Sequence, residues 1–464
     1  MKVSLLIDFG STNTKVVAVD LENERVLDVA QSPSTVDTDI MSGLRNAVAK
    51  LRTDDEPLNE NLVERRLACS SAAGGLKLVA IGLVPELTLE AARMAALGAG
   101  AKVVGSYSYE ITQEELEGIR KAQCDIILLG GGTDGGNREV VTNNARTLAD
   151  SSINVPIVVA CNKSANSKVK SILESAGKYV VVSENVLPEL DRLNEEPARS
   201  CIRELFLKRI VKAKGLDGAR EYVGDVIMPT PMAVLNASRL LAEGAEGEVG
   251  LGELMVVEVG GATTNVHSVA RGACQAGVLV KGLPEPYAKR TVEGDLGIRY
   301  NATTILELVG EDRLRRSTPA VAEHPGLTDA IRTLSRHVAF VPHTEKDYAV
   351  DVALARTAVE IATERHAGVL KEVYAISSVA YIQHGKDLSE VGKIIGTGGV
   401  FAYGRMPSFI LEAAIFDRQK PMNLKPKSPQ LYIDQRYILF AVGLLSEVFP
   451  AKALRIAKKY LTQV

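Results

Sequence analysis

Apolar residues along the chain follow two patterns, short runs typical of strands and longer stretches with helical spacing. Residues 3–9 and 15–20 are apolar runs on either side of a short polar turn, which predicts a hairpin. From about 78 to 190, strand-like and helix-like segments alternate, which predicts a self-contained parallel α/β unit. One predicted helix of this unit carries Thr112 and Glu115 at the spacing of a capping box.

The arrangement of strand, small-residue turn and strand occurs again in the stretch GELMVVEVGGATTNVHSVARG. It lies between a predicted helical region at 187–245 and a largely helical span at 300–375. The stretch VGKIIGTGGVFAYG then predicts a strand, a glycine turn and a helix, and two helices close the chain. We interpret the turns at 10–14 and 260–264 as corresponding hairpins of two halves, with the α/β unit inserted in the first half.

Each of these two turns follows a strand that ends in an acid, Asp8 or Glu258. Glycine and small hydroxylic residues then let backbone N–H groups approach an anion closely, and the acid can hold a hydrated Mg²⁺ beside phosphate. An ordinary hairpin is the alternative for either turn alone, but two matching turns favour phosphate binding. The candidate phosphate-binding residues are Gly10, Ser11, Thr12, Asn13, Thr14, Lys15, Gly260, Gly261, Ala262, Thr263 and Thr264.

Two further segments carry candidate chemistry. A glycine-rich turn between a strand and a helix can lie flat against a base and ribose, although a tight connection is the alternative; it comprises Gly396, Thr397, Gly398 and Gly399. Glu293 and Asp295 flank Gly294 beyond the second phosphate turn. A carboxylate there can orient an attacking water, and a solvated turn is the alternative. The candidate catalytic residues are therefore Asp8, Glu258, Glu293 and Asp295.

One glycine pattern points to a different fold. Gly130, Gly132 and Gly135 satisfy G-x-G-x-x-G after a predicted strand, as in dinucleotide-binding proteins. That fold needs an acid at the end of the next strand, where this chain has Asn162. We therefore expect a polar edge that faces either the cleft or a partner protein, formed by Thr133, Asp134 and Asn137.

Composition narrows the function classes. A chain of 464 residues suggests two to four domains, and a net charge of -3 gives no basic excess for nucleic acid or membrane. The five cysteines are scattered, which favours a reduced, cytoplasmic setting. The start of the chain does not resemble a signal peptide, and charges interrupt the most apolar region, 78–105. The histidines show no metal-ligand spacing, so no site made only of protein ligands is expected.

Taken together, the motifs resemble the MutL/GlmL family, whose members are associated with adenosylcobalamin-dependent glutamate mutase. This family belongs to the actin-like ATPase (ASKHA) superfamily of sugar kinases, Hsp70 and actin. Glu258 and Ala262 depart from the superfamily pattern, which usually has Asp and Gly there. The stretches that carry the resemblance are IDFGSTNTKV, CSSAAGGLKLVAIGLVPELT, GGGTDGGN, VVEVGGATTNVHSV, EGDLGIRYNA and IIGTGGVF.

The resemblance implies a two-lobed, ribonuclease H-like α/β fold with an α/β insertion in the first lobe. The expected divisions are lobe I (1–75), the insertion (76–190), a helical return (191–248), lobe II (249–440) and C-terminal helices (441–464). It also implies a chaperone-like protein that reactivates the mutase, with weak Mg-ATP hydrolysis closing the lobes. Two alternatives are a small-molecule kinase with Asp295 as base and a nucleotide-binding partner module that does not hydrolyse ATP.

Overall fold

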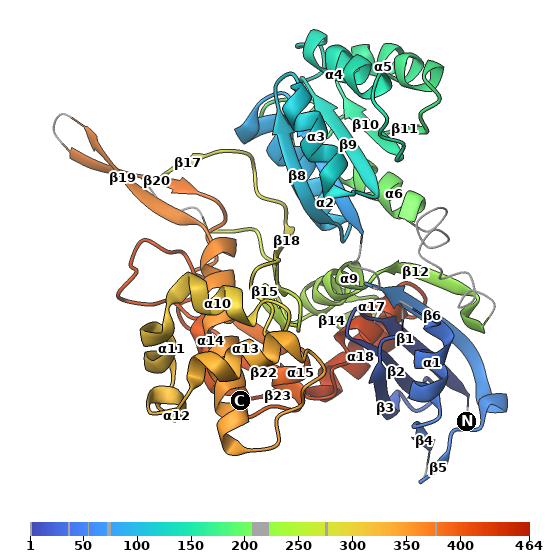
Figure 1. Ribbon diagram of the computed structural model, residues 1–464, viewed down its shortest axis with the longest axis vertical. Coiled ribbons are helices and arrows are strands. Elements are labelled where there is room, and N and C mark those ends of the chain that lie inside the picture. The colour runs from blue at the N-terminus through green and yellow to red at the C-terminus, as the bar shows by residue number, and fades with distance from the viewer. Residues whose placement is uncertain are drawn as a thin grey trace.

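The structure is a computed structural model, shown in Figure 1, and it describes most of the chain. The described ranges are 2–35, 38–53, 55–71, 76–206, 222–273, 277–375 and 378–464. Residues 207–221 of the helical region predicted at 187–245 lie outside these ranges, as do residues 72–75 of the stretch CSSAAGGLKLVAIGLVPELT and Cys274. The chain forms two large mixed sheets and a third, parallel sheet.

The first sheet contains the opening hairpin. Its order is β12-β6-β1-β2-β3; β1 pairs antiparallel with β2 and parallel with β6. Every side chain of β1 is buried, because the strand lies at the centre of the sheet and is covered on both faces. The elements are β1 (Val3–Phe9), β2 (Asn13–Asp20), β3 (Arg25–Pro33), β6 (Val63–Ser70), β12 (Asp225–Pro229) and the covering helix α1 (Ile40–Val48).

The second sheet repeats the topology of the first. Its order is β18-β16-β15-β21-β22-β23, with β15 antiparallel to β16 and parallel to β21. Two sheets of one topology are what a ribonuclease H-like, actin-like architecture requires, so the predicted fold class is confirmed. The strands are β15 (Leu254–Val259), β16 (Thr264–Val269), β18 (Ala288–Glu293), β21 (Lys393–Thr397), β22 (Gln430–Asp434) and β23 (Leu461–Gln463).

A parallel sheet is inserted between β6 and β12 of the first sheet and stands apart from both large sheets in Figure 1. Its order is β11-β10-β9-β7-β8, and the capping box of Thr112 and Glu115 forms as predicted. We call this sheet and its helices the inserted unit. They are β7 (Lys77–Gly82), α2 (Glu90–Gly98), β8 (Lys102–Ser108), α3 (Gln113–Ala122), β9 (Ile126–Gly131), α4 (Glu139–Ala149), β10 (Ile157–Cys161), α5 (Lys163–Ser175) and β11 (Val180–Val182).

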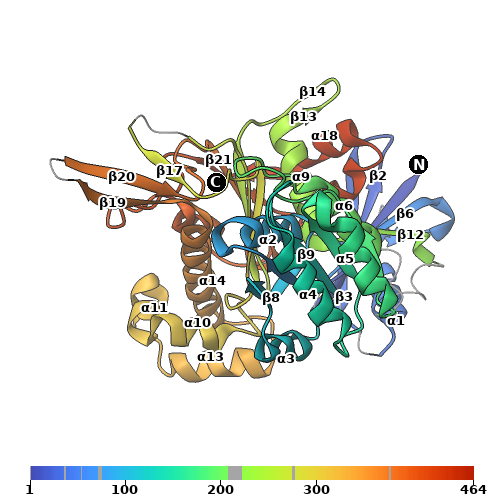
Figure 2. The ribbon, with the colours of Figure 1, turned by 90° about the horizontal axis from the view of Figure 1, so that it is seen from above.

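Two helices, α9 (Thr230–Glu243) and α17 (Leu439–Ser446), pack in the core between the large sheets. They touch at Gly443, where an added Cβ would lie 1.8 Å from the carbonyl oxygen of Ala233. This core also contains residues of both sheets, such as Leu6 and Val256. The helices therefore connect the two halves directly. Figure 2 shows the molecule from above, with α9 near the middle of the view.

The remaining helices mainly follow β18 and β22. The long helix α14 packs beneath the second sheet, and its buried residues run along its whole length. These helices are α6 (Glu196–Leu205), α10 (Ala302–Val309), α11 (Glu311–Ser317), α12 (Pro319–Ala322), α13 (Leu327–Arg336), α14 (Glu345–His366), α15 (Gly399–Ala402), α16 (Pro407–Leu411) and α18 (Pro450–Tyr460). None of the helices described combines the length and hydropathy needed to cross a bilayer.

The structure corrects three predictions of secondary structure. The region 187–245 contains strand β12, and the predicted helical span to 375 ends with α14 at His366. A hairpin follows instead, formed by β19 (Val369–Ala375) and β20 (Ser378–His384), which pairs with β17 (Leu279–Lys281) and projects from the molecule (Figure 1). Strands β22 and β23 accompany the two closing helices. The predicted division into five segments stays a prediction.

Candidate functional site

The two candidate phosphate turns have the same internal hydrogen bond. The N–H of Gly10 donates to the carbonyl of Asn13 at 3.1 Å, and that of Gly260 donates to the carbonyl of Thr263 at 2.9 Å. An added Cβ on Gly10 would lie 2.5 Å from that Asn13 oxygen, so only glycine fits there without rearrangement. The resemblance between the two sequence stretches therefore extends to their backbone geometry.

The structure brings the two turns together. A Cβ built on Gly261 would lie 3.5 Å from Oγ1 of Thr12, so these two turns of different sheets approach each other closely. The backbone N–H groups of five turn residues donate no hydrogen bond within the described part of the chain. These residues are Ser11, Thr12, Gly261, Ala262 and Thr263. Unpaired amides gathered in facing turns form the kind of concavity that binds anions.

Asp8 lies at the end of β1 below the first turn and is almost fully buried. Its two oxygens accept hydrogen bonds from Nζ of Lys15 at 2.9 Å and from Oγ1 of Thr230 at 2.6 Å. Nζ of Lys15 also donates to the Tyr437 hydroxyl at 3.1 Å and lies 4.2 Å from the centre of its ring. Burial would lower the pKa of Lys15, but its interactions with Asp8 and Tyr437 together outweigh burial and raise that pKa. Lys15 is thus a cation held at the site.

Glu258 occupies the corresponding position in the second sheet. Its carboxylate accepts a hydrogen bond from Nδ2 of Asn265 at 2.9 Å and lies 4.0 Å from Nε2 of His267. Burial would raise the pKa of Glu258, but contacts with His267, Lys15 and Asn265 outweigh burial and hold that pKa below its ordinary value. Glu258 is therefore an anion, and Lys15 is close enough to act on both candidate acids.

The third glycine turn, at 396–399, lies beside the end of β15. Glu258 pairs with Thr397 across the β15–β21 ladder. Gly398 has φ +114°, and an added Cβ there would lie 2.3 Å from the carbonyl oxygen of Val259. The hydroxyl of Thr397 donates to Asp434 at 2.9 Å, and this carboxylate caps the start of α17. The turn is therefore placed against the second phosphate turn rather than elsewhere on the molecule.

Glu293 and Asp295 have a different environment. Both accept hydrogen bonds from Nη1 of Arg365, at 2.6 and 3.0 Å. The backbone of Glu293 pairs with Thr264 of the second hairpin, yet among the described residues neither carboxylate contacts Asp8, Lys15 or Glu258. Burial raises the pKa of Glu293 although Arg365 opposes this change. The two carboxylates line a separate pocket beside the inserted unit.

The polar residues predicted to form an edge of the inserted unit make hydrogen bonds mainly with neighbouring residues near that same edge. Asp134 accepts hydrogen bonds from the N–H of Lys163 and from Nδ2 of Asn185, at 2.9 and 3.0 Å. Asn162 caps α5 and donates to the carbonyls of Gly136 and Asn137. Asn162 therefore stabilises the glycine loop at the strand end where a dinucleotide-binding fold would have an acid.

Comparison with known proteins bears on these features. The family model described as MutL protein matches residues 4–461. The curated Protein MutL of Clostridium tetanomorphum is 49% identical over 466 residues and covers 100% of both chains. The chain belongs to the MutL family.

Solved structures that resemble this MutL-family chain do so at low identity. A nucleotide-free acetone carboxylase is 14% identical with a TM-score of 0.41, and the match covers 96% of this chain and 70% of the other. The activator of the 2-hydroxyisocaproyl-CoA dehydratase from Clostridium difficile, with bound ADPNP, is 8% identical with a TM-score of 0.30 and coverages of 98% and 96%. A glycerol dehydratase reactivase is 11% identical with a TM-score of 0.34 and coverages of 96% and 99%.

The residues Asp8 and Glu258 are of the kind that can take part in a magnesium–nucleotide site. Among the described residues, no three His, Cys, Asp or Glu side chains gather closely enough to hold a metal ion. Mg²⁺ in nucleotide sites usually keeps several waters and takes one or two carboxylates together with phosphate oxygens. Asp8 and Glu258, beside free turn amides, supply that kind of partial ligand set.

Sequence reasoning missed two residues of the site, Thr230 and Tyr437. Thr230 begins α9 between two prolines and reaches Asp8 over 222 positions of sequence. The neighbouring prolines show in the sequence that Thr230 lies at a helix start. They do not show that its side chain contacts Asp8. Tyr437 contacts Lys15 over 422 positions and has φ +54° between β22 and α17. Nothing in its sequence neighbourhood distinguishes it from other tyrosines.

Proposed function

We propose that this MutL-family protein binds Mg-ATP between the turns at 10–14 and 260–264. It would act as an ATP-dependent accessory protein that remodels or reactivates an adenosylcobalamin-dependent mutase of the glutamate mutase type. The observation that carries the proposal is the close approach of Thr12 and Gly261, which gathers unpaired amides from both halves beside Asp8 and Glu258. ATP would thus be bound by both halves at once.

Each side chain has a separate task in this proposal. Free amides and hydroxyls of the turns bind the β- and γ-phosphates, as they do in other nucleotide-binding loops. Bound Mg²⁺ would be held by Asp8 through water, with Glu258 nearby, and would neutralise phosphate charge. Lys15 gives its charge to the phosphates when it turns away from Asp8. Glu258, which remains ionised, orients the attacking water.

The third turn would bind the adenosine end. At Gly399 no atom of another described part of the chain lies within 4 Å of the place that a Cβ would take, so its backbone is open to a ligand. Thr397 and Gly398 place this backbone next to the end of β15. A planar base can approach such a surface because no side chain covers it.

A chain of hydrogen bonds would carry the nucleotide state to the inserted unit. Arg290 on β18 donates to the carbonyls of Leu97 and Ala101 at the end of α2, at 3.0 and 3.3 Å. It also donates to Oδ1 of Asn265 at 3.3 Å, and Asn265 donates to Glu258 at 2.9 Å. A change at Glu258 would therefore alter the position of α2. Such a shift requires that the nucleotide bind one arrangement of α2 and the second sheet more tightly than the other.

The arrangement favours this accessory role over a small-molecule kinase. A kinase of this superfamily needs a free carboxylate against the acceptor hydroxyl, and Asp295 is instead paired with Arg365. ATP consumption stimulated by one metabolite would support the kinase alternative. Calorimetric ATP binding without turnover, even with mutase present, would support a binding module that does not hydrolyse ATP.

The proposal is tested by phosphate release with Mg-ATP, alone and with purified mutase carrying inactivated cobalamin. Wild type should release phosphate faster when the mutase is added. Asp8→Asn should lose at least about 10²-fold in rate, the typical size of one electrostatic group acting on a transition state. Asp191→Asn is the matched control, because Asp191 is exposed on the surface of the same half. Equal rates for wild type and Asp8→Asn would contradict the role given to Asp8.

A further inference from the structure

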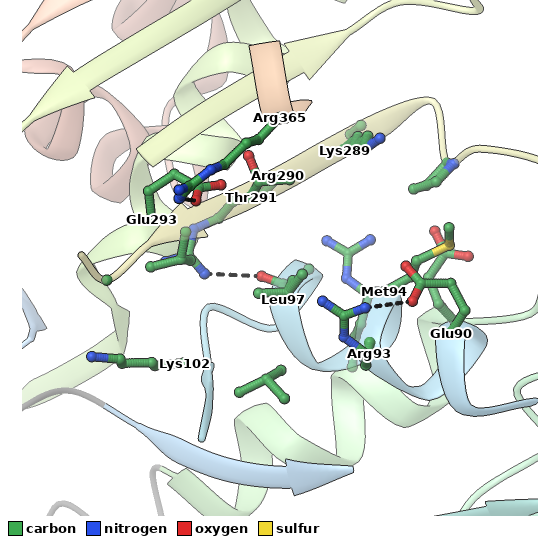
Figure 3. Close-up of a pocket in the computed structure, with 18 of the residues that line it drawn as sticks. Glu90, Arg93, Met94, Leu97, Lys102, Lys289, Arg290, Thr291, Glu293 and Arg365 are labelled. Atoms are coloured by element: carbon green, nitrogen blue, oxygen red, sulfur yellow. Dashed lines mark hydrogen bonds and ion pairs between the residues drawn. The ribbon is translucent and has the colours of Figure 1, made fainter. Parts of the chain in front are cut away.

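A pocket of about 720 Å³ lies where the inserted unit meets the second sheet. Its walls come from α2, the start of β8 and the start of α6 on one side. On the other side they come from β18 with the following segment, α10 and the end of α14. Figure 3 shows Met94 and Leu97 of α2 facing Arg290 and Thr291 of β18 across this space. We call it the seam pocket. Its volume is in the range of pockets that bind small molecules.

The seam pocket is lined by charged side chains of both signs. Four carboxylates line it, and three of them are paired with arginines of the same wall: Glu90 with Arg93, and both Glu293 and Asp295 with Arg365. Six cationic side chains line it: Arg93, Lys102, Arg199, Lys289, Arg290 and Arg365. Two of these cations, Lys289 and Arg199, pair with Glu285 and Glu196, which do not line the pocket. The preference of the walls for an anionic occupant therefore depends on how completely the individual cations are paired.

Two of the cations are buried and incompletely paired. Arg199 and Arg290 are only 5% and 4% exposed, and in the described residues Nε of each is buried without a hydrogen-bond partner. Arg290 otherwise contacts neutral oxygens, and Arg199 makes its ion pair through Nη1 with the largely exposed Glu196. A buried donor without an acceptor is costly, and the cost is relieved if an acceptor enters beside it.

Lys102 is a third cation of the seam pocket and, unlike Arg199 and Arg290, it is exposed. It begins β8 and, within the described chain, makes no ion pair. Its Nζ would lie 3.1 Å from a Cβ built on Gly294, so the side chain of Lys102 reaches across from the inserted unit to the segment after β18. Figure 3 shows this side chain extended and separate from the arginine–carboxylate pairs. A ligand in the pocket can therefore contact cations from both walls.

We propose that the seam pocket binds a small organic anion through carboxylate or phosphate oxygens, with Lys102, Arg199 and Arg290 as its partners. Guanidinium groups suit such oxygens because their planar N–H groups match the geometry of the acceptor. The site is separate from the nucleotide turns and does not depend on the function proposed for them. Because its two walls belong to different units, the anion would also hold the inserted unit against the second sheet.

The proposal is tested by isothermal titration calorimetry of the full chain with four probes. Inorganic phosphate and succinate distinguish the two kinds of anionic group, citrate offers several carboxylates, and glycerol is the uncharged control. The variants are Lys102→Gln and Arg199→Gln, with Lys168→Gln as matched control on the exposed face of α5. Lys102 is exposed, so its variant should fold even if Arg199→Gln does not, and thermal melting checks both.

We expect saturable binding of at least one anion and none of glycerol. Lys102→Gln should weaken that binding about tenfold, which corresponds to the loss of one charge-assisted hydrogen bond, while Lys168→Gln should leave it unchanged. Asp8→Asn should keep the anion affinity, so a failure of nucleotide binding and a failure of this site give different results. No saturable binding, equal binding by wild type and Lys102→Gln, or loss of anion binding in Asp8→Asn would overturn the proposal.

Discussion

At the scale of single residues, the site depends on two positions where only glycine fits and on a buried pair of charged side chains. Gly10 and Gly398 have no room for a Cβ, since the nearest carbonyl oxygens would lie 2.5 and 2.3 Å away. Asp8 and Lys15 hold each other within a buried pair that also involves Thr230. A buried ion pair of this kind is a weak source of stability but fixes the positions of both groups.

The first prediction concerns Gly398, whose φ of +114° and close neighbour Val259 both exclude a larger residue. Gly398→Ala should lower the free energy of unfolding by about 2 kcal/mol, through backbone strain and overlap together. Gly399→Ala is the matched control, because no atom of another described part of the chain lies within 4 Å of its Cβ position and it begins α15. Urea denaturation measures both variants. A similar loss for the two would show that the conformation of Gly398 is not the cause.

The second prediction concerns the ionisation of Glu258. Its folded-state pKa lies below the ordinary value of 4.5, so its charge contributes stability above that value. This contribution is lost as the pH falls from 4.5 through the lowered pKa. The difference in free energy of unfolding between wild type and Glu258→Gln should therefore shrink on acidification. Urea denaturation at pH 6 and at pH 4 or below gives the comparison, and a difference that grows in acid would contradict the direction.

At the scale of elements, local signals in the sequence predicted structure well and long-range contacts were not predicted. The capping box at Thr112 needs only its own neighbours and forms as expected. The hairpin of β19 and β20 was not predicted, although Arg365 and His366 in the last turn of α14 and Gly368 just after it form a helix-stop signal. The sequence interpretation extended the helical span past this signal to residue 375. The role of Arg290 could not be predicted from the sequence, since its hydrogen-bond partner Leu97 lies 193 positions away.

The third prediction concerns the connection that Arg290 makes between α2 and Asn265. Arg290→Gln removes the donors to the carbonyls of Leu97 and Ala101 and should uncouple the inserted unit from Glu258. The ratio of mutase-stimulated to basal phosphate release should then fall toward one. Arg93→Gln is the matched control, because Arg93 lies on α2 and, in the part of the chain that the structure describes, pairs only with Glu90 on the same helix. An unchanged ratio in Arg290→Gln would exclude this route of transmission.

At the scale of the whole molecule, the two large sheets share one topology and the core between them contains α9 and α17. The sequence predicted this duplication from two short turns, because each turn follows an acid at the end of a central strand. It did not predict that Thr230 and Tyr437 would join the site, since both depend on how α9 and α17 cross. The close approach of the two turns is therefore a property of the whole fold.

The central claim is that both turns bind one polyphosphate, and hydrogen–deuterium exchange measured with and without Mg-ATP tests it most directly. The amides of Ser11, Thr12, Gly261, Ala262 and Thr263 make no internal hydrogen bond among the described residues, so they should exchange rapidly in the free protein. Mg-ATP should slow exchange in peptides covering 10–14 and 260–264 together. Protection of only one turn, or of neither while ATP binds, would contradict the account.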